Sequence, residues 1–365
     1  MNELALRQQR TVDRIALVGS AIAILGATAF VTLDPVQTVA RRSSPAVPAH
    51  AAAAAPVAAT PERSPLVQLS LPSPAWTVVS DGTWAAYARL AKDEPAEIIV
   101  RSLHADDSRV AYRAGTSSYI GQLSLSRGVL ALEEILQSGT DGRRAISVRA
   151  LTVSTGEVTL IDRFEPTRSL TASPVTDGSR VLWIRPGTSG DEIREFDLVS
   201  GKTRIVRHDD AQIAALAIGV DAIAYTVFSG ETAKTFVLDP STGAATPVDG
   251  FAYSYIQSVG PDGVVVTGAV TAGSPAASWL VRPDAAKTRL GSDCLNVTMT
   301  ARVLAMRCAS QIEIRDLATA SSLYRFAGNA GALAVFDDGV VWGEGDELML
   351  YELPALSDAS RARPE

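Results

Sequence analysis

Histidines that stand close to carboxylates are the first candidates for chemistry in this chain. His104 and His208 are each followed within three residues by two aspartates. Such segments could supply a general base with carboxylates, or a calcium-binding loop. A solvated polar loop is the simpler interpretation, because each segment lies between two predicted strands. The sequence holds no Gly-x-Ser-x-Gly elbow, His-Glu-x-x-His pair or P-loop. We therefore predict no catalytic residue, no metal ligand and no cofactor.

Glu133 and Glu134 are adjacent carboxylates within a predicted strand. Successive side chains of a strand point to opposite faces, so these two cannot act on one substrate as an acid and a base. We expect each of them to form a salt bridge or to lie at the rim of the fold.

Cys294 and Cys308 are the two cysteines of the chain, and they bracket a predicted turn centred on Ala301. A three-residue turn would set them opposite each other on antiparallel strands, at a separation that suits a disulfide. A turn of two or four residues would shift the register. Export from the cytoplasm would favour oxidation, so we predict a disulfide, with two buried free thiols as the alternative. Two cysteines without a nearby histidine fall short of a zinc site.

These residues must be positioned by a repeated fold, because the sequence repeats a turn followed by an apolar strand about every 40 residues. Four copies contain Asp-Gly and three are looser. In chain order the seven copies begin at Ser80, Ser126, Thr176, Gly219, Pro261, Thr300 and Asp337.

A strand–turn–strand unit follows each of the first six copies, as in "IREFDLVSGKTRIVR" and "IEIRDLATASSLYRF". Each repeat therefore holds four short strands, which is typical of a β-propeller blade. The last repeat lacks its fourth strand, and residues 64–73, "SPLVQLSLPS", can supply it and leave no open edge. We predict an all-β fold, a seven-bladed β-propeller with four-stranded blades.

Residues 175–208, "VTDGSRVLWIRPGTSGDEIREFDLVSGKTRIVRH", resemble the repeat of TolB-type, WD40-like propellers. That repeat runs Pro-Asp-Gly, a strand, a polar loop with Gly, and a strand that ends in Asp-Leu before a Thr-Gly turn. The likeness extends over roughly residues 64–354. Only the copy at Pro261 keeps the proline, and the Gly-His and Trp-Asp marks of true WD40 blades are absent. The resemblance implies a propeller, and by analogy protein–protein interaction in a bacterial envelope compartment.

An uncharged run from Ile15 to Leu33 precedes the repeats and is long enough for a transmembrane helix. Ala27-Thr28-Ala29 offers a peptidase site, so a cleaved signal peptide is the alternative. Three arginines before the run place the N-terminal tail in the cytoplasm. The predicted organisation is a cytoplasmic tail (1–14), a signal-anchor helix (15–33), a disordered Ala/Pro-rich tether (34–64), the propeller (65–354) and a disordered tail (355–365).

Loops between the second and third strands are the expected binding surface, because loops on a rigid ring usually carry function. Residues of these loops that could contact a partner at the rim are Lys92, Asp93, Glu94, Arg143, Arg144, Asp191 and Glu192.

A net charge of -7 and a pI near 5.2 argue against nucleic acid as a partner. We predict a monomeric, membrane-tethered propeller in the periplasm or at the cell surface, which binds an envelope or membrane protein and catalyses no reaction. Signal cleavage would instead make it a secreted protein. One alternative function is an extracytoplasmic hydrolase or lyase acting on a glycan or lactone. Another is the sensor domain of a multi-chain signalling system.

Overall fold

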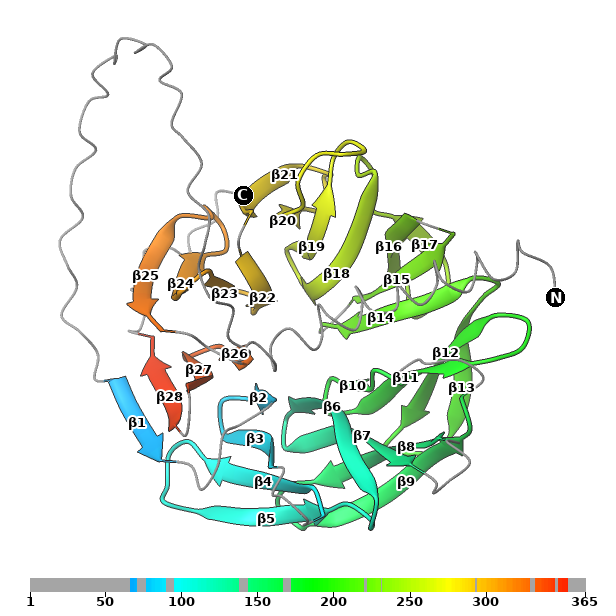
Figure 1. Ribbon diagram of the computed structural model, residues 1–365, viewed down its shortest axis with the longest axis vertical. Helices are drawn as coiled ribbons and strands as arrows, with labels where there is room; N and C mark the ends of the chain where they lie inside the picture. The colour runs from blue at the N-terminus through cyan, green and yellow to red at the C-terminus, as the bar shows by residue number, and fades with distance from the viewer. Residues whose placement is uncertain are drawn as a thin grey trace, which may run out of the picture.

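Seven four-stranded antiparallel sheets form a ring in the computed structural model, so the predicted seven-bladed β-propeller is confirmed (Figure 1). The described residues are 66–70, 77–89, 95–137, 144–166, 172–219, 222–230, 232–292, 294–328, 332–344 and 347–353. The predicted N-terminal tail, anchor and tether, together with the C-terminal tail, lie outside them. Within the described ranges, no helix has the length and apolar character needed to cross a membrane.

The strands of each blade follow one another from the channel outward. Blade 1 holds β2 (Val78–Ser80), β3 (Trp84–Arg89), β4 (Glu97–Ser102) and β5 (Ser108–Arg113). Blade 2 holds β6 (Ser118–Ser126), β7 (Val129–Gln137), β8 (Arg144–Thr152) and β9 (Glu157–Phe164). Blade 3 holds β10 (Val175–Thr176), β11 (Arg180–Pro186), β12 (Asp191–Asp197) and β13 (Thr203–Asp209).

The next three blades repeat this arrangement. Blade 4 holds β14 (Gln212–Ile218), β15 (Ile223–Ser229), β16 (Thr232–Leu238) and β17 (Ala245–Pro247). Blade 5 holds β18 (Tyr253–Gly260), β19 (Gly263–Ala269), β20 (Ala277–Val281) and β21 (Lys287–Gly291). Blade 6 holds β22 (Cys294–Met299), β23 (Val303–Cys308), β24 (Gln311–Asp316) and β25 (Ser322–Ala327).

Blade 7 combines the two ends of the propeller. Its inner strands are β26 (Ala332–Phe336), β27 (Gly339–Glu344) and β28 (Glu347–Glu352), and its outermost strand is β1 (Leu66–Ser70). β1 runs antiparallel to β28, with Leu66 opposite Tyr351 and Ser70 opposite Glu347. The predicted closure of the ring by the N-terminal strand is thus confirmed. The edge of β28, which would otherwise be open, is paired.

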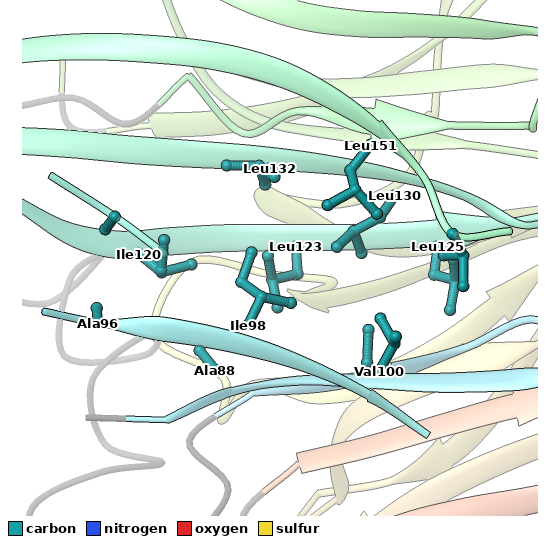
Figure 2. Packing of buried hydrophobic residues seen from close by; sticks show 13 residues of the cluster. Ala88, Ala96, Ile98, Val100, Ile120, Leu123, Leu125, Leu130, Leu132 and Leu151 are labelled. Carbon is teal, nitrogen blue, oxygen red and sulfur yellow. The ribbon is translucent and has the colours of Figure 1, made fainter. Parts of the chain in front are cut away.

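Apolar residues on both faces of the middle strands hold neighbouring blades together. Figure 2 shows Ile98 and Val100 of β4 close to Leu123 and Leu125 of β6. Leu130 of β7 belongs to the same cluster and is fully buried. Burying one side chain of this size stabilises the fold by roughly 1.5–3 kcal/mol. Because each contact between blades buries several of them, it forms a separate hydrophobic core. Both faces of a blade are covered, which explains why strands such as "VLWI" have no polar face.

Cys294 and Cys308 form a disulfide between β22 and β23. The turn between these strands holds four residues, 300–303, because Met299 pairs with Leu304. A four-residue turn alone would have misaligned the cysteines. A β-bulge between Leu295 and Thr298 adds one residue to β22 and brings Cys294 opposite Cys308. The expectation of a three-residue turn was therefore wrong, and the bulge sets the register.

Candidate binding site at the mouth of the central channel

The seven innermost strands surround a central channel with a cavity of about 1140 Å³. None of these strands contains Asp, Glu, Lys, Arg or His. The walls are instead made of small neutral side chains such as Val79, Ser124, Ala217, Ser258 and Thr298. The walls can therefore contact a ligand by shape and hydroxyl groups, but they place no ionised group beside it.

Among the described residues, the charged side chains that line the channel lie at one end of it. Asp81, Arg127, Asp177 and Asp337 all lie in turns between the first and second strands of their blades. We call these four residues the mouth, and the face of the ring that carries these turns the turn face. The mouth concentrates three carboxylates and one guanidinium above an uncharged wall.

The turns between third and fourth strands lie on the same face. In five blades an apolar residue directly after the third strand donates its backbone N–H to a carbonyl of the first turn. The pairs are Leu103 with Thr83, Val153 with Gly128, Leu198 with Ser179, Leu317 with Arg302 and Leu353 with Asp338, at 2.8–3.0 Å. The apolar residue that follows the third strand, which is the leucine of Asp-Leu in blades 3 and 6, therefore fixes the end of that strand to the first turn.

The aspartate of the turn in blade 1 organises the local backbone. Oδ1 of Asp81 accepts hydrogen bonds from the N–H groups of Thr83 (3.0 Å) and Trp84 (2.9 Å). The Ser80 hydroxyl donates to the carbonyl of Trp84 and accepts from the N–H of Gly82. Gly82 has φ +89°, a conformation that glycine adopts without strain. Oδ2 of Asp81 also accepts from the N–H of Gly128 at 2.6 Å, which links blade 1 to blade 2.

Blade 3 repeats this turn with a threonine in place of the serine. Oδ1 of Asp177 accepts from the N–H groups of Ser179 and Arg180, and Gly178 has φ +90°. Burial raises the pKa of Asp177, but hydrogen bonds from Ser179 and Arg180 outweigh it and hold that pKa below its usual value. Asp177 is therefore a carboxylate at neutral pH. Its oxygens are already used by the turn, which makes it a poor proton carrier.

The Asp-Gly copies in blades 5 and 7 stand in the same place but form shorter turns. Gly260 pairs with Gly263, and Phe336 with Gly339, so only two residues lie between the strands. In blade 7 these two residues are Asp337 and Asp338, and both are exposed. The sequence repeat thus located the turns correctly, but it did not reveal that they have two lengths.

The residues predicted to lie at the rim are found in different environments. Lys92, Asp93, Glu94 and Arg143 lie outside the described residues. Arg144 is exposed at the start of β8, and Glu192 is half-buried and paired with Arg194 at 2.7 Å.

Asp191 contradicts the prediction of an exposed rim residue, because it is 0% exposed. Its Oδ2 accepts the N–H of Ile213, the second residue of β14, at 2.8 Å. The preceding Gly190 lies so close to the Asp209 carbonyl that a Cβ there would be 2.2 Å from the oxygen. This approach turns the loop inward, and Asp191 joins blade 3 to blade 4 instead of facing a partner.

Glu133 and Glu134 point in opposite directions as predicted, but neither lies at the rim. Glu134 forms a salt bridge with Arg149 at 3.1 Å. Glu133 is 0% exposed, and no salt bridge to it is found among the described residues. The His104 segment is a polar turn after β4, as predicted, but His208 belongs to the end of β13 and not to a loop, and its ring lies 3.4 Å from Asp210. Within the described ranges, no three His, Cys, Asp or Glu side chains gather in a way that could hold a metal ion.

The chain matches no known protein family and no curated protein by sequence. Solved structures share its fold. It resembles the β-propeller domain of the trilobed protease from Pyrococcus furiosus, which has an open velcro topology (TM-score 0.55, 12% identity, 80% of this chain and 99% of that one). It also resembles a prolyl endopeptidase (TM-score 0.54, 13% identity), covering 78% of this chain but only half of the endopeptidase. TolB from Acinetobacter baumannii is a third similar structure (TM-score 0.47, 14% identity, 75% of this chain and 65% of TolB).

The sequence predicted none of the four mouth residues as part of a site, and Arg127 is the one that lies outside the Asp-Gly turns. It forms a two-residue turn with Gly128, in which both residues have positive φ (49° and 73°). This is the backbone pattern of a tight hairpin turn. The looser repeat "SRGVLALEE" indicated the turn, but only the closed ring shows that Arg127, the first residue of that turn, borders the channel.

Proposed function

We propose that this protein is a membrane-tethered propeller that acts outside the cytoplasm and binds another envelope protein at the mouth, without catalysing a reaction. The observation that carries the proposal is the distribution of charge around the channel. Four charged side chains surround its opening, while its seven wall strands have none. Charges at an opening steer and orient a partner, whereas acid–base chemistry needs titratable groups beside the reacting atoms.

The roles of the mouth carboxylates support binding over catalysis. Asp81 and Asp177 accept hydrogen bonds from the backbone of their own turns, so their positions are fixed. Rigid charges on a ring make a preorganised docking surface, because little side-chain freedom is lost when a partner binds. The proposed location outside the cytoplasm is supported by the apolar run at residues 15–33 and agrees with the Cys294–Cys308 disulfide.

Photo-crosslinking in cells tests the proposal. A crosslinking amino acid replaces Asp337 at the mouth in one variant, and Thr188 in the matched control. Thr188 is an exposed residue in the loop between the second and third strands of blade 3. We expect one envelope protein to crosslink at position 337 and not at 188, and Arg127→Glu to weaken that crosslink. Equal crosslinking at both positions, or a crosslink insensitive to Arg127→Glu, would contradict docking at the mouth.

The compartment and the anchor need separate measurements. An alkaline phosphatase fused after residue 365 should be active only if the propeller is exported. The mass of the mature protein then distinguishes a retained anchor from a cleaved signal peptide. An inactive fusion would overturn the proposed location.

A further inference from the structure

A second cavity, of about 230 Å³, opens on the turn face where blade 7 meets blade 1. We call it the side pocket. Its lining residues are His104 from the turn after β4, Phe336 and Asp338 around the turn after β26, and Leu350, Glu352 and Leu353 from the end of β28. Phe336 also lines the central channel, so one aromatic ring separates the side pocket from the mouth.

The apolar part of the side pocket is a rigid base. Phe336 and Leu350 are buried, and the Phe336 ring packs so closely on Gly82 that a Cβ there would be 3.0 Å from it. Gly82 in turn holds His104, because the ring nitrogen Nε2 of His104 lies 2.8 Å from the Gly82 carbonyl oxygen. The Asp-Gly turn of blade 1 therefore positions two sides of the pocket.

The polar groups of the side pocket are hydrogen-bond acceptors. A carbonyl oxygen only accepts, so Nε2 of His104 must donate to Gly82, and the neutral ring then has Nδ1 as an acceptor. Asp338 and Glu352 add two exposed carboxylates, and neither forms an ion pair with another described residue. A ligand for such a pocket must bring donors and positive charge.

The size of the pocket restricts that ligand further. Small-molecule sites usually have volumes of about 300–1,000 Å³, and this cavity is smaller. An arginine or lysine side chain combines a charged donor group with an apolar stem that can lie on Phe336 and Leu350. We propose that the side pocket binds one arginine or lysine side chain of a partner protein. This inference rests on the proposed function and names the chemistry of the partner.

The position of the pocket shows how a basic segment would bind. Asp337 lines the channel and the next residue, Asp338, lines the side pocket. A segment that lies across the turn of blade 7 thus meets carboxylates on both sides of Phe336. One basic side chain enters the side pocket, and the rest of the segment reaches the mouth.

Binding is tested with a small probe and the full-length chain in detergent. The probe is N-acetyl-arginine amide, and the control is N-acetyl-citrulline amide, which has almost the same shape without the charge. Because the chain has three histidines, ¹³C labelling of histidine allows the signal of each ring to be followed by NMR. We expect the His104 signal to shift saturably with the arginine probe and to stay unchanged with citrulline. His208, beside Asp210, is an internal control for general attraction of cations to carboxylates.

Substitutions of the two pocket carboxylates test whether the probe binds in the side pocket. Asp338→Asn and Glu352→Gln should each weaken probe binding by roughly two- to fivefold, the effect of losing one exposed ion pair. Asp284→Asn is the matched control, because it removes an exposed carboxylate from a turn of blade 5 on the same face, and this residue lines neither the channel nor the side pocket. It should leave probe binding unchanged. The crosslink at position 337 tests docking at the mouth, whereas the probe tests the side pocket alone, so failure of the proposed function and failure of this inference can be told apart.

Three results would overturn the inference. The first is an equal shift with citrulline, and the second is a parallel shift of His104 and His208. The third concerns the arginines of the chain itself. If replacing Arg63, Arg361 and Arg363 with glutamine moves the His104 signal without any probe, the pocket is occupied by its own chain and not by a partner.

Discussion

The two sides of β7 carry carboxylates in different settings: the glutamate that faces blade 1 has a cationic partner, whereas the glutamate that faces blade 3 has none among the described residues. Two neighbours on β7 make this difference. Glu134 accepts hydrogen bonds from the Tyr112 hydroxyl (2.8 Å), the N–H of Gly115 (2.8 Å) and Nε of Arg149 (3.1 Å). Tyr112 and Gly115 come from blade 1 and its link to blade 2, so Glu134 holds the two blades together.

Glu133 faces the other way and accepts hydrogen bonds from backbone groups alone. The donors are the N–H groups of Ala172 and Gln122. A β-bulge in β6 sets Gly121 and Gln122 opposite Glu133, and this turns an amide toward the carboxylate. Gly121 leaves the necessary space, because a Cβ there would lie 2.3 Å from Oε2 of Glu133.

The pKa values of the two glutamates are therefore shifted in opposite directions. Burial raises the pKa of Glu134, but hydrogen bonds from Gly115 and Tyr112 and the charge of Arg149 outweigh it and hold that pKa below its usual value. Burial raises the pKa of Glu133 to about 7, and its two backbone hydrogen bonds only partly oppose this. The comparison teaches that strand alternation decides where a side chain points, while the neighbouring blade decides its charge.

The largest effect is expected from Glu134→Ala. It leaves the guanidinium of Arg149 and the hydroxyl of Tyr112 without their partner, and removing one member of a largely buried pair costs about 3 kcal/mol. Urea unfolding of the variant measures the loss of unfolding free energy. Glu157→Ala, an exposed glutamate in the same blade, is the control and should change stability by less than about 0.5 kcal/mol. A loss below about 1 kcal/mol for Glu134→Ala would contradict the linking role.

A smaller, pH-dependent effect is expected from Glu133→Gln. The folded-state pKa of Glu133 is raised from 4.5 to about 7, so the folded protein keeps a proton that the unfolded chain releases. Wild-type stability therefore falls as pH rises from about 4.5 to 7, by up to roughly 3 kcal/mol, and is constant above that range as far as this group is concerned. Glutamine cannot ionise. The stability difference should therefore grow by about 2 kcal/mol in favour of the variant from pH 5 to pH 8, because wild type has already lost part of this contribution at pH 5.

Unfolding curves of both proteins between pH 5 and 8 measure this difference. Glu133→Asp is the control, because it keeps an ionisable carboxyl group and should retain the pH dependence. Parallel pH curves for wild type and Glu133→Gln would show that Glu133 does not change its charge in this range.

Asp81→Ala should weaken the contact between blades 1 and 2 on the turn face. It removes two hydrogen bonds within the turn and the bond from Oδ2 to the N–H of Gly128 in blade 2. We expect a loss of about 1–2 kcal/mol in unfolding free energy, measured by thermal or urea unfolding. Asp106→Ala, a fully exposed aspartate in the same blade, should have almost no effect. Similar losses of unfolding free energy for the two variants would contradict the idea that Asp81 links the blades.

The smallest effect is expected from Asp162→Asn, on the side where blade 2 meets blade 3. Asp162 accepts a hydrogen bond from Nε1 of Trp183 at 3.0 Å and pairs with Arg185. Asparagine keeps an acceptor for the tryptophan but loses the ion pair, and Arg185 is partly exposed. We expect a loss of about 0.5–1 kcal/mol at low salt, which shrinks in 1 M NaCl because exposed charges are screened. A loss that does not depend on salt would assign the effect to packing.

Local pattern was enough to predict the architecture. Each blade is a meander of neighbouring strands, so its turns and strands appear in order along the chain, as "VTDGSRVLWI" and "IREFDLVSG" illustrate. The closing strand was also predictable, because blade 7 lacked a fourth strand and residues 66–70 had no other partner in sequence. The uncharged channel walls follow directly from the composition of the seven inner strands.

The sequence repeat did not predict the contacts between blades. Asp191 reads as a loop residue, and it is buried because β14 of the next blade offers the N–H of Ile213. The alignment of Cys294 with Cys308 depends on a bulge that the strand pattern of β22 does not indicate. The raised pKa of Glu133 requires the burial that the packed blades impose.

The sequence by itself determined the repeat and the number of blades, because these depend on neighbours along the chain, and the incomplete last repeat identified the strand that closes the ring. Only the tertiary structure decided the mouth and the side pocket. His104 and Asp338 are more than 230 positions apart, and they line one cavity because the last blade packs against the first. Ring closure converts the two ends of a linear repeat into adjacent surfaces, and a site formed there has no signature in any single repeat.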